Sequence, residues 1–241
     1  MDVIPLDRGT ALRVEGLTYR YPDGTPALNG VDLSVARGES VAVLGPNGAG
    51  KSTLMLHMNG ILSGEGRIKV MGIEVNRKNL RKVRSIVGLV FQDPDDQLFS
   101  PTVREDVAFG PLNQKLAGEL VDHAVDRALR WVGMEGAGER SPFHLSFGEK
   151  KRIALATVLA MDPEILVLDE PASNLDPRGR REFIELLGSL EVTKLVVTHD
   201  LEMARAICGR AVIMEGGRIV ADGRIESVLG DKDLLERSGL L

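Results

Sequence analysis

The stretch Gly45-Pro46-Asn47-Gly48-Ala49-Gly50-Lys51-Ser52-Thr53 decides the fold. It has the pattern G-x-x-x-x-G-K-[ST], which is typical of a phosphate-binding loop (P-loop) between a strand and a helix. The residues before it, 41–44, form an apolar, β-branched run that predicts a buried parallel strand. The residues after it, 54–58, favour a helix, which Asn59 and Gly60 end. The motif therefore lies in the context that it requires.

The composition of this loop suits a bound triphosphate, because glycines let the backbone approach phosphate oxygens without Cβ clashes. Successive N–H groups and the positive end of the following helix then face the phosphates. In this pattern Lys51 reaches the β- and γ-phosphates, and the Ser52 hydroxyl binds Mg²⁺. The alternative is a glycine-rich turn with a solvated lysine. The candidate nucleotide-binding residues are Gly45, Pro46, Asn47, Gly48, Ala49, Gly50, Lys51, Ser52 and Thr53.

The composition of the chain limits its partners. The formal net charge of −5 over 241 residues argues against a general nucleic-acid binder, which needs a basic face. The single cysteine, Cys208, allows no internal disulfide and fits a reducing compartment. No apolar run approaches the ~18–20 residues that cross a bilayer, and residues 1–9 lack the apolar core of a signal peptide. We expect a soluble, cytoplasmic chain whose membrane role, if any, runs through a partner.

The hydrophobic pattern predicts an α/β fold. Alternating residues predict strands that form an antiparallel β unit around the P-loop strand, at 11–17, 31–35 and 66–71. Continuous apolar runs predict buried strands at 86–90, 165–168 and 195–198, and a hairpin is expected at 211–221. Helices are expected at 119–132, 146–161 and 177–190, and a short mixed helix within 222–241. Residues 95–111 are expected to be a loop, with apolar residues that either pack locally or offer a site for a partner.

We interpret the whole chain, 1–241, as a single domain with a P-loop NTPase (RecA-like) fold. Its mostly parallel core sheet and antiparallel β subdomain comprise residues 1–91 and 162–241. A helical subdomain, 92–161, is inserted between two strands of the core.

Polar residues follow three of the predicted buried strands. Asp169 and Glu170 end one strand at the edge where open α/β sheets bind ligands, so Asp169 can hold Mg²⁺ and Glu170 can polarise an attacking water. The alternative is an acid pair that caps a helix. Gln92 can meet a metal or water, or it is a solvated loop residue. His199 can contact a γ-phosphate, although a lone histidine is usually structural.

Two helix starts and one aromatic residue complete the candidates. Ser146-Phe147-Gly148-Glu149 has the S-x-x-E pattern of a capping box, and Asp176 precedes a proline as the N-cap of the next helix. Tyr21, just upstream of the P-loop, can stack on an adenine or pack on its strand neighbours, and the spacing alone favours packing.

The order of these motifs resembles the ATP-binding subunit of an ABC transporter over about 12–223. The motifs are the P-loop, Gln92, 145–149, the Asp169–Glu170 strand, 173–176 and His199. The resemblance implies that Tyr21 stacks on adenine, Gln92 contacts Mg²⁺ or water and senses the membrane partner, and His199 contacts the γ-phosphate. It implies a head-to-tail dimer of two ATPase copies, with ATP between the P-loop of one copy and the signature stretch of the other.

The signature stretch departs from the family's usual L-S-G-G-Q, because Phe147 replaces a glycine and Glu149 replaces the glutamine. Glu149 brings a negative charge near the partner's nucleotide unless it is turned back as a cap. The implied contacts to the second copy's nucleotide are Ser146, Phe147, Gly148, Glu149 and Asp176.

A narrower likeness lies in residues 87–99 and 101–111, which are similar to energy-coupling-factor importer ATPases, most of all the cobalt/nickel branch. This implies a transmembrane coupling protein and a substrate-capture membrane protein as partners, with the chain on the cytoplasmic face of the membrane. Vitamin importers share much of this stretch and are the alternative. A DNA-repair ATPase would carry a long coiled-coil insertion, and a translation ATPase would carry two P-loops. A non-motor binding module is disfavoured by the intact Lys51, Asp169, Glu170 and His199.

Overall fold

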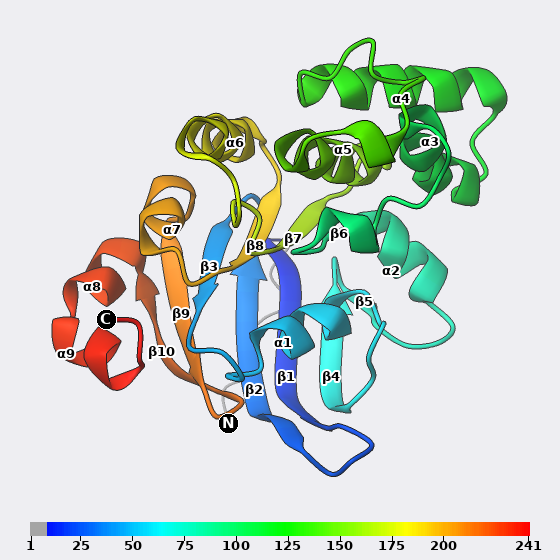
Figure 1. Ribbon diagram of the computed structural model, residues 1–241. Helices are drawn as coiled ribbons and strands as arrows, with labels where there is room; N and C mark the ends of the chain where they lie inside the picture. Colours follow the sequence, from blue (N-terminus) through cyan, green and yellow to red (C-terminus); the bar gives the residue numbers. More distant parts are fainter. Residues whose placement is uncertain (1–8) are drawn as a thin grey trace.

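The computed structural model describes residues 9–241 and contains two sheets with helices around them (Figure 1). The expectation about a leader in residues 1–9 therefore lies, except for Gly9, outside the described residues. The core sheet has the strand order β10-β9-β3-β8-β7-β6. Its strands are β3 (Ser40–Leu44), β6 (Val87–Val90), β7 (Ile165–Asp169), β8 (Thr193–Val197), β9 (Arg210–Glu215) and β10 (Arg218–Arg224). All neighbours are parallel except β10, which pairs antiparallel with β9.

The second sheet is antiparallel and has the order β2-β1-β4-β5. Its strands are β1 (Thr10–Arg20), β2 (Pro26–Ala36), β4 (Glu65–Val70) and β5 (Ile73–Glu74). Helix α1 (Lys51–Met58) packs with both sheets, because Leu54, Met55 and Met58 share one apolar cluster with alternate residues of β1 and β3. The predicted antiparallel unit and mostly parallel core sheet are confirmed.

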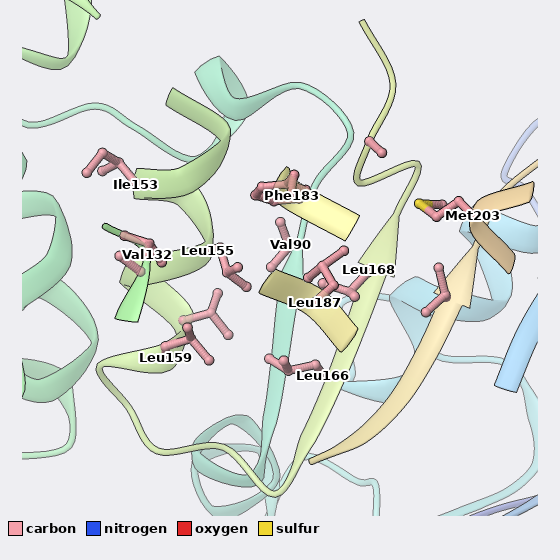
Figure 2. Close-up of a cluster of buried hydrophobic side chains, with 14 of the residues drawn as sticks. Val90, Val132, Ile153, Leu155, Leu159, Leu166, Leu168, Phe183, Leu187 and Met203 are labelled. Atoms are coloured by element: carbon pink, nitrogen blue, oxygen red, sulfur yellow. The ribbon is translucent and has the colours of Figure 1, made fainter. Parts of the chain in front are cut away.

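The core sheet is buried on both faces. Along β3, Val41 and Val43 belong to the cluster with α1, whereas Ala42 and Leu44 belong to the cluster under the other helices. Since successive strand residues point to opposite faces, a strand covered on both sides needs a continuous apolar run, as 41–44 has. Figure 2 shows the second cluster, in which Phe183 and Leu187 pack over the β7 strand.

Of the remaining helices, the one at Leu80–Ile86 joins the cluster with α1 through Val83 and Ile86, and the others contribute to the second cluster. In chain order they are α2 (Leu80–Ile86), α3 (Val103–Asn113), α4 (Gly118–Trp131), α5 (Phe147–Leu159), α6 (Pro177–Ser189), α7 (Leu201–Ile207), α8 (Ile225–Gly230) and α9 (Lys232–Arg237). Three of them, α3 to α5, lie together between β6 and β7 in the chain (Figure 1). Within residues 9–241, no helix combines the length and apolarity that a membrane crossing needs.

The loop expected at 95–111 was wrong in its second half. Helix α3 begins at Val103 because Thr102 and Glu105 form a capping box: the Thr102 hydroxyl accepts from the Glu105 N–H, and the Glu105 carboxylate accepts from the Thr102 N–H. Val103 and Val107 then lie fully buried. The T-x-x-E pattern of Thr102 and Glu105 is the sequence signal for this helix start.

Three smaller expectations also need correction. Ile86 ends helix α2, so the strand begins at Val87. Helices α2 and α7 were not expected. The single helix expected in 222–241 is two short helices, α8 and α9, after a β10 strand that continues to Arg224.

Candidate active site

The P-loop connects the end of β3 at Leu44 to the start of α1 at Lys51, as predicted. Gly45 (φ 146°) is required by a close approach, because a Cβ there would collide with the main-chain carbonyl of Met214 on β9. Gly50 (φ 98°) adopts the left-handed conformation at the N-cap of α1. These two positions turn the chain sharply enough to place the loop against the carboxyl edge of the sheet.

Lys51 begins α1, and its buried side chain turns back into this loop. Its Nζ donates to the carbonyl oxygens of Gly45 at 2.7 Å and Pro46 at 2.9 Å. Burial lowers the pKa of Lys51, and the nearby charges of Glu170 and Asp169 oppose that shift. The two carboxylates therefore favour the charged form of Lys51. Its ammonium group is the positive charge that would attract a phosphate anion to the loop.

The acid pair, Asp169 and Glu170, lies at the carboxyl end of β7. Strand β7 pairs with β8, and β8 pairs with β3, the strand before the P-loop. Asp169 and Glu170 are both buried. Burial raises the pKa of Asp169, while a hydrogen bond from the Ser52 hydroxyl and the charges of Lys51 and Lys151 act in the opposite direction. A serine hydroxyl and a carboxylate are the hard oxygen donors that Mg²⁺ prefers, so these residues fit that ion.

Gln92 is exposed and follows β6 by two residues. Because β6 pairs in parallel with β7, Gln92 leaves the sheet at the same edge as Asp169. Its amide oxygen is a donor of the same chemical type, so Gln92 also fits Mg²⁺.

Glu170 and His199 form a direct pair. Glu170 Oε1 lies 2.7 Å from His199 Nδ1 and accepts from the His199 N–H at 2.9 Å, and Oε2 accepts from the Thr198 hydroxyl at 2.9 Å. Since the carboxylate accepts, Nδ1 carries a proton in this contact, which leaves Nε2 as the ring nitrogen available to another group. The His199 side chain is 70% exposed, whereas its partner is held inside the site.

Tyr21 lies beside the P-loop helix. Its hydroxyl is 2.8 Å from the Thr53 hydroxyl, and its ring packs edge-on against Tyr19 with centroids 5.2 Å apart. The packing that the spacing favoured is present. The side chain nevertheless remains 38% exposed, which leaves ring surface for a further contact.

The predicted capping box at the start of α5 is confirmed. Glu149 Oε2 accepts from the Ser146 N–H and hydroxyl, both at 2.8 Å, and the Glu149 N–H donates to the Ser146 hydroxyl at 3.3 Å. Glu149 Oε1 accepts from Arg140 at 2.8 Å. The bonds from the Ser146 backbone and from Arg140 lower the pKa of Glu149 to about 2. The carboxylate is thus turned back onto its own helix.

The predicted N-cap at Asp176 is also confirmed. Its carboxylate accepts from the N–H groups of Arg178 at 3.0 Å and Gly179 at 3.1 Å, which begins helix α6 after Pro177. These bonds lower the pKa of Asp176, with the Gly179 N–H as the larger cause.

The sequence analysis missed two residues of this site. Thr198 is fully buried and binds the Glu170 carboxylate, and its place directly before His199 at a strand end was a usable signal. Lys151 is also fully buried, and its Nζ donates to the Glu170 carbonyl oxygen at 3.1 Å. In the sequence, Lys151 lies within the basic run Lys150-Lys151-Arg152, and such charged runs are usually solvated.

A P-loop, a buried acid pair and a histidine at the carboxyl edge of a mostly parallel sheet define a P-loop NTPase. The chain matches the protein-family model described as ABC transporter over residues 28–173. It is 58% identical, over 95% of its own length and 88% of the relative, to a Streptomyces coelicolor protein described as an ABC transporter ATP-binding protein. The chain therefore belongs to the ABC transporter family, as an ATPase subunit.

Other similar proteins place it more closely. The energy-coupling factor transporter ATP-binding protein EcfA of Methanothermobacter thermautotrophicus is 48% identical over 95% of this chain and 76% of the relative. Among solved structures, CbiO1 of Clostridium perfringens, part of the ABC transporter complex CbiONQ, has a TM-score of 0.83 and 41% identity, covering 96% of this chain and 95% of that chain. A dimeric ATP-binding cassette bound to ADP and Pi has a TM-score of 0.79 and 28% identity, covering 89% and 98%.

Proposed function

We propose that this ATPase drives an energy-coupling-factor importer and that the imported solute is cobalt or nickel ion. The likeness to CbiO1, which belongs to a CbiONQ complex, carries the proposal together with the 48% identity to EcfA. ATPases of vitamin importers or of other ABC transporters are the second candidate, because nothing in the ATP site touches the cargo.

We assign roles in ATP hydrolysis from the contacts of the site. Lys51 binds the β- and γ-phosphates, and Ser52, Asp169 and Gln92 would hold Mg²⁺, which would neutralise phosphate charge. Glu170 orients the attacking water and accepts its proton, since its carboxylate is already held by Thr198 and His199.

His199 contacts the γ-phosphate through Nε2, because Nδ1 is occupied by Glu170. Phosphate oxygens only accept, so this contact uses the form of the ring in which Nε2 also carries a hydrogen. Tyr21 offers its exposed ring surface to the adenine.

We further propose that two copies of the chain form a head-to-tail homodimer, with Ser146, Phe147, Gly148, Glu149 and Asp176 of one copy at the nucleotide of the other. The dimeric cassette bound to ADP and Pi supports this arrangement. The N-terminus of α5 carries the backbone N–H groups and the positive end of the helix dipole, which favour an anion. Because Glu149 is paired with Arg140, its charge is partly neutralised and does not stand free against that nucleotide.

The membrane partners dock in a groove between α2, α3 and α5 that is lined in part by exposed aromatic residues. Phe99 and Phe109 are 61% and 52% exposed and pack edge-on with centroids 5.2 Å apart. Phe91 also lines this groove, and the next residue is Gln92. A helix of the transmembrane coupling protein seated here would reach the ATP site through that residue. The coupling protein and a substrate-capture protein would hold the chain at the cytoplasmic face of the membrane.

The test is uptake of labelled cobalt and nickel by native cells that carry either the wild-type chain or Glu170→Gln as their sole copy. Loss of uptake of either ion, with vitamin and amino-acid uptake intact, is the expected result. Unchanged uptake of both ions would overturn the metal assignment and direct the search for the solute to vitamins.

A further inference from the structure

Lys151 is a fully buried lysine in the N-terminal half of α5, five residues after Ser146. Its Nζ donates to the main-chain oxygen of Glu170 at 3.1 Å and lies 3.4 Å from the Ser173 hydroxyl. The ring of Phe147 lies with its centroid 5.6 Å from the same nitrogen. Lysine is rarely buried unless its charge is compensated, so this placement needs a reason.

The carbonyl that Lys151 binds belongs to a residue with an unusual backbone. Glu170 has φ 41°, in the left-handed region that residues with a Cβ seldom occupy unless their surroundings impose it. Its carbonyl oxygen accepts three hydrogen bonds, from Lys151 Nζ, the Ser173 N–H and the Ser173 hydroxyl. Its own N–H donates to the Val197 oxygen at 2.8 Å. This backbone angle sets the direction in which the Glu170 side chain leaves β7.

We propose that Lys151 is a positioning residue that holds the Glu170 backbone in its left-handed conformation and thereby aims the carboxylate at the attacking water. The proposal rests on the role in hydrolysis proposed for Glu170. Of the groups that fix this carbonyl, Lys151 alone comes from α5, so the helix that begins with the signature stretch is tied directly to the acid of the same chain.

The charges around Lys151 support this role. Burial lowers its pKa to about 8, while Asp93, Glu170 and Asp169 favour the charged form. The ammonium group is therefore predominantly charged at neutral pH, and hydrogen bonds from a charged donor are stronger than neutral ones. The Phe147 ring covers it and adds a cation–π contact, which gives a physical reason for an aromatic residue at this signature position.

A consequence concerns the proposed dimer. If α5 shifts when Ser146 meets the partner's nucleotide, the Lys151 bond transmits that shift to Glu170 of its own chain. The hydrolysis site would then respond to occupancy of the other site.

The test compares Lys151→Met with Lys151→Arg in the purified full-length protein. We expect Lys151→Met to lower kcat about 10- to 100-fold, because small misplacements of a catalytic group cost that much. The dissociation constant for a fluorescent ATP analogue should stay within about twofold, since the contacts of the P-loop are untouched. Lys151→Arg, which keeps the charge and the donors, should restore a large part of kcat.

Lys194→Met is the matched control, because Lys194 is also buried and donates to a main-chain oxygen, that of Leu190 at 2.6 Å. Lys194 lies near the start of β8, whereas Thr198 and His199 of the site follow its end. Loss of the Lys194 amine should therefore lower the melting temperature and leave kcat per folded protein nearly unchanged. Equal losses of kcat in both methionine variants, or a normal kcat in Lys151→Met, would overturn the proposal.

Glu170→Gln in the same assay separates the role of Glu170 from the role of Lys151. Slow hydrolysis by Glu170→Gln with normal turnover by Lys151→Met would reject only the role of Lys151, whereas normal turnover by Glu170→Gln would reject the role of Glu170 itself. If Lys151→Met does not fold, Ser173→Ala removes another donor to the same oxygen and should also lower kcat with unchanged nucleotide affinity. An unchanged kcat in Ser173→Ala would then count against the proposal.

Discussion

Replacing Glu149 by glutamine tests whether the signature carboxylate acts as a helix cap. In the folded protein its pKa is lowered from 4.5 to about 2, first by the Ser146 backbone N–H and then by Arg140. A shift of that size corresponds to about 3 kcal/mol, at about 1.4 kcal/mol per pKa unit. Because the side chain is about one-third exposed, solvent screening reduces this, and we expect about 1–2 kcal/mol of pH-dependent stabilisation.

The sign follows from which form the fold prefers. The folded state favours the ionised carboxylate, so this stabilisation is complete above pH 4.5 and declines as the pH falls toward about 2. Glutamine keeps an acceptor oxygen but has no charge, and it resembles the protonated glutamate. The free energy of unfolding should therefore differ between wild type and Glu149→Gln by a constant amount from pH 7 to pH 5, and the difference should shrink below that.

The assay is urea denaturation of both proteins at pH 7, 5, 4 and 3.5, with the difference in unfolding free energy plotted against pH. Subtraction removes the titration of the other carboxylates, which both proteins share. A difference that stays constant down to the lowest pH would refute the reasoning, because it would mean that the charge of Glu149 does not stabilise α5.

Three further substitutions have defined outcomes. Glu170→Gln should slow ATP hydrolysis by about 10²-fold or more while ATP still binds, as judged by steady-state phosphate release and equilibrium binding; turnover near wild type would contradict the assigned role. Thr102→Ala removes the cap of α3 and should lower the free energy of unfolding by about 1 kcal/mol in urea, whereas an unchanged midpoint would mean that the box is not needed. Phe183→Ala leaves a cavity in the cluster of Figure 2 and should cost about 3–5 kcal/mol; a loss below ~1 kcal/mol would mean that this site is loosely packed.

Local signals in the sequence predicted the parts of the site that depend on neighbouring residues. The P-loop was found because the loop, its strand and its helix are contiguous, and the caps at Ser146 and Asp176 were found because each joins a side chain to N–H groups two or three residues away. The same rule applies to the cap at Thr102, so the start of helix α3 is also encoded by a local signal.

The sequence by itself determined the class of fold and the chemistry of the candidate residues, because the hydrophobic period of each strand and the spacing of the P-loop are local properties of the chain. Only the tertiary structure decided how those residues meet. Glu170 faces His199 because β7 and β8 are neighbours in the sheet although far apart in the chain. Lys151 reaches the Glu170 carbonyl because α5 packs against β6, the neighbour of β7 in the sheet. The physical reason is that hydrogen bonds and charge interactions depend on distance in space, which the strand order sets and the local pattern does not contain.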